Sequence, residues 1–165
     1  MRYERFEQLP VWKASIDLAV QTYVTTSKPP FRRQHSLREQ IERAAVSISN
    51  NIPEGFERGT NRELLAFLYI ARGSAGEVRS MLCLLERLPG FRDLESDILN
   101  SKSQAESISK QLGAWIRSLQ DSGLKGQRYV TGRTKKADQA RHEREEFLKK
   151  LEEIRKGASP APEKP

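Results

Sequence analysis

Few residues of this chain have the types and spacing that catalysis or metal binding requires. His35 and His142, the two histidines, have no cysteine or carboxylate at a metal-ligand spacing, and neither belongs to the Glu-x-x-His pair used by di-iron bundles. Cys83 lies in the apolar run MLCLL. It is expected to be a small hydrophobic residue of the core or, because it is one position past Leu82, to lie at a subunit contact. No serine, histidine and aspartate grouping suggests a nucleophile. We therefore expect no metal, no cofactor and no enzymatic activity.

Arginine is the most informative residue type. Between residues 29 and 101 the sequence has ten arginines and no lysine. Arginine suits planar, bidentate contact with phosphate or carboxylate, although codon usage or ion pairs between subunits would leave the same bias. Arg58 and Arg62 repel each other unless an anion or acid lies nearby, and Arg72 and Arg79 share one helix face. The residues expected to contact nucleic acid are Arg32, Arg33, Arg38, Arg58, Arg62, Arg72, Arg79, Lys125, Arg128, Arg133, Lys135, Lys136 and Arg141.

The whole chain is basic and contains no membrane signal. It has 165 residues and a formal net charge of +7, which favours an anionic partner, RNA or DNA before an anionic membrane. Its apolar runs are only a few residues long, so no segment could span a bilayer, and the N-terminus lacks the apolar centre of a signal peptide. A single cysteine is compatible with a reducing compartment. We expect a cytoplasmic protein with no membrane partner.

Apolar spacing predicts four long helices and no strand. They cover residues 11–27, about 36–55, 61–88 and about 94–119. Capping-box spacings begin the second helix at Ser36 and the third at Thr60. Pro53 should kink the second helix or end it early, and Gly55 or Gly59 should stop it. In the first helix one apolar stripe is formed by Trp12, Ile16, Ala19, Val20, Tyr23 and Val24.

The third and fourth helices alternate apolar spacings of four and three residues, the heptad pattern of bundle cores. The two stripes are Leu64, Leu68, Ala71, Ala75, Val78, Leu82 and Leu85, and then Leu94, Ile98, Ser101, Ala105, Ile108, Leu112, Trp115 and Leu119. Short loops between long amphipathic helices predict an antiparallel, up-down-up-down four-helix bundle over residues 1–120.

Residues 121–165 form a basic C-terminal extension, partly helical or disordered. Residues 125–144 carry seven basic residues against two acidic ones, and 134–156 have the charge spacing of a fifth, solvated helix. Residues 157–165 have a disordered composition.

Two polar or small-residue features have alternative interpretations. Asn51 and Glu54 form a polar helix end, or they join Glu77 in a buried polar network across the bundle. Gly73 and Gly76 lie inside the third helix, where glycine is destabilising. We expect this cost to be offset by the close approach of a neighbouring backbone, or the glycines to mark a kink.

Four pieces of the sequence resemble a known family: LPVWKASIDLAVQTYVTT (9–26), LREQIERAAVSISNNIPEG (37–55), FLYIARGSAGEVRSML (67–82) and a final amphipathic helix. They resemble the four-helix-bundle proteins encoded in intervening sequences of large-subunit ribosomal RNA genes. The same superfamily includes the accessory variability determinant of diversity-generating retroelements. One departure is that Ser49 and Pro53 stand where the family usually has proline and alanine. The segment LGAWIRSLQDSGLKGQ (112–127) is more similar to the retroelement branch.

The resemblance implies a homopentamer with a basic surface for RNA or DNA and, in the retroelement branch, a reverse-transcriptase partner. The first hypothesis is therefore a non-catalytic nucleic-acid-binding accessory protein, with RNA favoured, that acts as a homo-oligomer. The alternative is an oligomeric adaptor whose basic tail docks a protein partner. Apolar residues beyond the core stripes, some of which should face a neighbouring subunit, include Leu65, Phe67, Ile70 and Met81.

Overall fold

The computed structural model describes residues 3–122, 146 and 149, and the part it describes contains helices and no strand. The long helices are α1 (Pro10–Thr26), α2 (His35–Glu57), α3 (Asn61–Arg87) and α4 (Glu95–Asp121). Short 3₁₀ turns, η1 (Phe6–Gln8), η2 (Pro29–Arg33) and η3 (Pro89–Leu94), precede α1, α2 and α4. The predicted all-α bundle is confirmed, whereas the predictions for the basic extension fall almost entirely outside the described residues.

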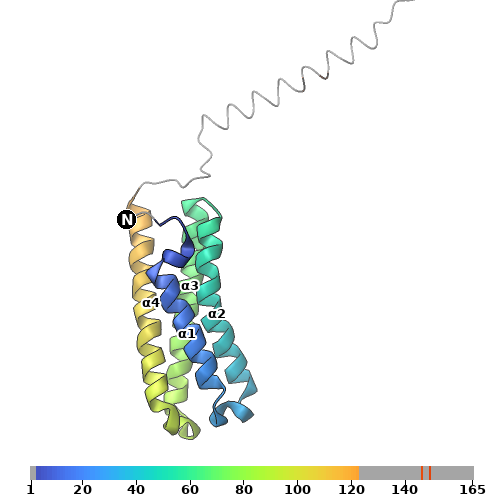
Figure 1. Cartoon of the computed structure of the whole chain (residues 1–165), viewed down its shortest axis with the longest axis vertical. Coiled ribbons are helices and arrows are strands. Elements are labelled where there is room, and N and C mark those ends of the chain that lie inside the picture. Colours follow the sequence, from blue (N-terminus) through green and yellow to red (C-terminus); the bar gives the residue numbers. More distant parts are fainter. Residues whose placement is uncertain (1–2, 123–145, 147–148, 150–165) are drawn as a thin grey trace, which may run out of the picture. The chain divides into compact units, whose positions relative to one another are not determined.

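The helices pack as a bundle in which α1 and α3 each contact both α2 and α4 (Figure 1). Neighbouring helices run in opposite directions. Along α2 and α3, Ser47 contacts Ser74 while the earlier Gln40 contacts the later Glu77. Between α3 and α4, Lys102 donates a hydrogen bond to Glu86, and the later Gln120 donates to the hydroxyl of the earlier Tyr69.

The predicted core stripes of α3 and α4 are confirmed. Every stripe residue of α3 is buried except Leu64, which is partly buried, and in α4 only Trp115 and Leu119 remain partly exposed. At one end of the bundle Phe31 of η2 meets Phe91 of η3 edge to face, with ring centroids 4.8 Å apart. Both rings are buried, so these two short turns close that end of the core.

Helix ends follow the sequence at α3 and depart from it at α2. Thr60 caps α3 by accepting a hydrogen bond from the backbone N–H of Glu63 at 3.2 Å. The helix α2 begins at His35, next to the predicted start near Ser36, but the predicted capping box does not form, because α2 has no side-chain cap. The helix also continues through Pro53 to Glu57, past the expected stop at Gly55. Gly59, with a φ of 80°, follows the end of the helix and occupies the left-handed conformation that suits glycine.

The predicted buried face of α1 is right at Ala19 and wrong at three residues of its C-terminal half. Val20, Tyr23 and Val24 are about half exposed, with 58%, 48% and 50% of their surface accessible. Besides Ala19, the buried side is built from Val11, Leu18 and several hydroxyl side chains. Two of these hydroxyls, on Ser15 and Thr22, donate to carbonyls four residues earlier, at 2.6 and 2.7 Å. Burial of satisfied hydroxyls costs little, so a helix that is apolar on both sides can turn either side inward.

The glycines also depart from expectation. A Cβ at Gly73 or Gly76 would meet nothing within 4 Å, and α3 runs unbroken past both, so neither close packing within the described chain nor a helix end explains them. Close approach occurs instead at Gly55, where a Cβ would lie 2.8 Å from the Cβ of Phe67. This glycine lets α2 and α3 approach each other before the turn that joins them.

Candidate nucleic-acid interface

Two of the predicted arginines are engaged by acidic neighbours. Arg58 donates to Glu54 at 2.8 Å, lies 3.9 Å from a carboxylate oxygen of Glu63, and sits over the ring of Phe67 at 5.0 Å. These carboxylates offset the repulsion that the sequence predicted between Arg58 and Arg62. Arg58 therefore stabilises the turn between α2 and α3, and less of its charge is available to an outside anion.

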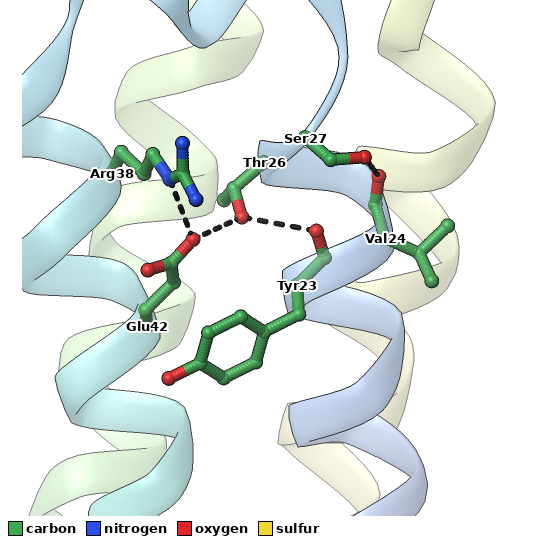
Figure 2. A network of polar contacts seen from close by, with 6 residues as sticks. All are labelled: Tyr23, Val24, Thr26, Ser27, Arg38 and Glu42. Atoms are coloured by element: carbon green, nitrogen blue, oxygen red, sulfur yellow. Dashed lines mark hydrogen bonds and ion pairs between the residues drawn. The ribbon is translucent and has the colours of Figure 1, made fainter.

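Arg38 has a similar structural role at the other end of α2 (Figure 2). Its Nε donates to Glu42 at 2.9 Å, and the hydroxyl of Thr26, at the end of α1, donates to the same carboxylate oxygen. The Thr26 hydroxyl also lies 3.2 Å from the carbonyl of Tyr23. Glu42 is thus a bridge between α1 and α2, and Arg38 neutralises it.

The arginines that stay exposed and unpaired are not gathered at one place. Within the described residues Arg32, Arg33 and Arg62 form no ion pair. Arg32 and Arg33 precede α2 and Arg62 follows it, and a helix of 23 residues is about 35 Å long. These three arginines therefore lie toward opposite ends of α2 rather than in one site.

Charged side chains do converge where α3 meets α4. We call this surface the α3–α4 face, and it comprises Arg72, Arg79 and Glu86 of α3 and Lys102, Glu106, Lys110, Gly113 and Arg117 of α4. Five of these residues are cationic and two are acidic, so the face has a surplus of positive charge. Its α4 members recur at spacings of three and four residues, which places them on one side of that helix.

The acids of the α3–α4 face lie toward the η3 end. Lys102 donates to Glu86 at 2.6 Å, and this bond raises the pKa of Lys102. Lys110 lies 2.8 Å from Glu106. The hydrogen bond from Lys110 lowers the pKa of the Glu106 carboxyl, and the positive charges of Lys110 and Arg79 lower it further. The positive charges of Lys102 and Lys110 are therefore balanced by Glu86 and Glu106, while the part of the face around Gly113 has an excess of positive charge.

Arg72 and Arg117 crowd around Gly113. A Cβ on that buried glycine would lie 3.4 Å from Cζ of Arg72 and 3.5 Å from Nη1 of Arg117. Seven residues further along α3, the Nε of Arg79 is buried. Among the buried side-chain nitrogen and oxygen atoms of the described residues, it is the single one without a hydrogen-bond partner. Nitrogen donors thus gather on this face without a full complement of acceptors.

Sequence reasoning missed Arg117, Lys102 and Lys110. The available signal was the seven-residue step from Lys110 to Arg117, the same step that joins Arg72 to Arg79. The six predicted basic residues after position 122 (Lys125, Arg128, Arg133, Lys135, Lys136 and Arg141) lie outside the described residues.

The proposed polar network of Asn51, Glu54 and Glu77 does not form. Asn51 donates to the carbonyl and hydroxyl of Ser47, and Glu54 pairs with Arg58. Glu77 is exposed and accepts a hydrogen bond from Gln40 at 3.3 Å. The separation follows from register, because Glu77 lies opposite the start of α2 rather than its end.

Metal clusters and membrane-spanning helices are two features that the part of the chain described does not contain. It holds no group of three or more histidine, cysteine, aspartate or glutamate side chains placed to bind a metal ion. None of its helices combines the length and hydrophobicity needed to cross a membrane.

Together the fold and the surface define a class: an all-α four-helix bundle with a cationic face along two adjacent helices. The family described as 23S rRNA-intervening sequence protein matches residues 7–114, about two thirds of the chain. The chain belongs to this family, and the resemblance noted from the sequence is confirmed. A search among curated proteins finds no match.

Proposed function

We propose that this protein is a non-catalytic RNA-binding accessory protein, located in the cytoplasm, that contacts RNA mainly through backbone phosphates. The observation that carries the proposal is the cationic surplus of the α3–α4 face, where Arg72 and Arg117 have no acidic partner among the described residues. Membership of a family named after a ribosomal RNA intervening sequence supports RNA as the partner. Charged side chains outnumber aromatic rings on this side of the bundle, where the exposed Tyr69 is bonded to Gln120, and this favours phosphate contacts over base stacking.

Salt dependence tests this proposal. The full chain is titrated into a fluorescein-labelled RNA stem-loop, and anisotropy gives the affinity over a series of sodium chloride concentrations. If about six phosphates are engaged, the plot of log affinity against log salt should have a slope near −5. A methylphosphonate oligonucleotide of the same sequence, which lacks the backbone charge, serves as control and should not bind. A slope near zero would overturn the proposal.

We further propose that the protein works as a homo-oligomer, with five copies implied by the family resemblance. The outward face of α1 supports an interface, because Val20, Tyr23 and Val24 place a contiguous apolar strip in solvent. Of the four apolar residues beyond the core stripes, some of which the sequence placed at a subunit contact, Ile70 is half exposed and Leu65 and Phe67 are partly buried. Met81 is buried within the bundle and is not available for such a contact.

The oligomer is tested by light scattering coupled to gel filtration. The wild-type chain should elute as a multimer, and Val20→Asp should lower the molecular mass toward that of one chain. Ser103→Asp, an equal change of charge at an exposed position of α4, is the control and should leave the multimer intact. A wild-type chain that is monomeric at all concentrations would refute the oligomer.

The same apolar strip favours a second candidate function, an oligomeric adaptor whose basic tail docks a protein partner. The likeness of residues 112–127 to the retroelement branch supports a reverse transcriptase as that partner. Purification from the host without nuclease treatment, followed by sequencing of the copurifying RNA and protein, separates the candidates. Deleting residues 125–165 should abolish protein partners and spare RNA affinity if the adaptor is correct.

A further inference from the structure

Two arginines far apart in sequence share one small area of the α3–α4 face. Cζ of Arg72 and Nη1 of Arg117 lie 3.4 and 3.5 Å from the same point, the position that a Cβ would occupy on Gly113. The separation of these two atoms therefore cannot exceed the sum of the two distances. The Nε of Arg72 also lies 3.6 Å from that point, so its guanidinium rests against α4 where the missing side chain leaves room.

Among the described residues, no acidic side chain balances this pair of guanidinium groups. Neither arginine forms an ion pair with any described residue, although Asp121 lies one turn beyond Arg117 on α4. Lys110, on the other side of Gly113, is engaged with Glu106. Two cations held close together without a counter-charge repel each other, and a bound anion would relieve that repulsion.

We propose that Arg72 and Arg117 together clamp one phosphodiester group of the RNA backbone, an inference that rests on the proposed RNA binding. Each guanidinium offers a planar fork of N–H donors, and a phosphodiester offers two charged oxygens that can accept from both. Gly113 leaves the space between the two groups open: an alanine Cβ there would touch them at ordinary van der Waals distance, and a longer side chain would occupy that space.

Arg79 extends the cationic line from this clamp along α3. It lies seven residues from Arg72, about 10 Å along the helix axis. Its buried Nε has no hydrogen-bond partner among the described residues, but its charge also attracts Glu106. Arg79 therefore lies outside the clamp itself and adds positive charge beside it.

A double-mutant cycle on the full chain tests the clamp. Arg72→Gln, Arg117→Gln and the double variant are titrated into the labelled RNA stem-loop over the same salt series. Arg43→Gln is the matched control, because Arg43 is an exposed arginine of α2 that forms no ion pair in the described part of the chain. Circular dichroism and urea unfolding establish that each variant is folded.

Each single variant should weaken binding about tenfold. The slope of log affinity against log salt should become shallower by about one unit, the contribution of one phosphate contact. Because both arginines hold the same phosphate, the double variant should bind almost as well as either single variant, with the slope still reduced by about one. Arg43→Gln should behave like the wild type.

The outcomes separate the clamp from RNA binding in general. If the two losses multiply and the double variant loses about two units of slope, the arginines hold different phosphates and the clamp is wrong. If both variants match Arg43→Gln while the wild type keeps a steep slope, the clamp fails and the proposed function stands. A wild-type slope near zero removes both.

Discussion

Replacing Gly73 and Gly76 with alanine should stabilise the bundle. Both glycines lie inside α3, where glycine costs about 1 kcal/mol relative to alanine because it gives up more backbone freedom on folding. A Cβ at either position would meet nothing within 4 Å, so no clash opposes the gain. Each single variant should therefore gain about 1 kcal/mol in the free energy of unfolding, and the double variant about 2 kcal/mol.

Urea unfolding followed by far-ultraviolet circular dichroism measures this change. With a denaturant dependence of about 2 kcal/mol per molar urea, the double variant should shift the midpoint upward by about 1 M. All variants must be compared at one protein concentration, since oligomerisation would add to apparent stability.

Gly55→Ala is the contrasting variant and should have the opposite sign. Its Cβ would lie 2.8 Å from the Cβ of Phe67 and 3.2 Å from the Cα of Leu64, so α2 and α3 would have to move apart. Overpacking of this kind costs about 1–3 kcal/mol and outweighs the gain in helix propensity. If Gly73→Ala and Gly76→Ala were as destabilising as Gly55→Ala, the outer face of α3 would have to be covered, and our reasoning would be refuted.

Three further predictions concern the helix cap, the closed end of the core and acid stability. Thr60→Ala should lower the free energy of unfolding by about 1 kcal/mol, because it removes the acceptor for the N–H of Glu63; Thr60→Ser, which keeps the hydroxyl, should be nearly neutral in the same urea assay. Phe31→Ala should cost about 4 kcal/mol in that assay, since the ring is 1% exposed and packs against Phe91; a loss below about 1 kcal/mol would contradict its place in the core. Lys110 lowers the folded-state pKa of Glu106 from 4.5, so the stabilisation by Glu106 is present above that pH and is lost as the pH falls through the lowered pKa. The stability difference between the wild type and Glu106→Gln should therefore shrink on acidification, and a constant difference would argue against the pairing.

The parts of the fold that could be predicted are those with an unambiguous apolar period. The stripes of α3 and α4 alternate at four and three residues, and almost all of their members are buried. The Thr60 cap was likewise readable, because the threonine and Glu63 have the spacing that capping needs. At α2 the equivalent spacing misled, since the helix begins one residue earlier and uses no side-chain cap.

The sequence indicated which residue type would form the candidate site, but not which individual residues would belong to it. Arginine enrichment directed attention to Arg72 and Arg79, which lie on the α3–α4 face, yet it gave equal weight to Arg38 and Arg58. These two differ because Glu42 and Glu54 lie one helical turn away and engage them. Arg117 escaped notice because its significance depends on a residue 45 positions earlier on another helix.

By itself the sequence determined that this chain forms long amphipathic helices and that two of them bury heptad stripes, because both properties arise from local spacing. Only the tertiary structure decided which side of α1 faces the core and where Arg72 meets Arg117. A helix that is apolar on two sides has no local preference between them, so its packing against α2 and α4 makes the choice. The meeting of two like charges above Gly113 likewise depends on the relative positions of α3 and α4, which no local pattern specifies.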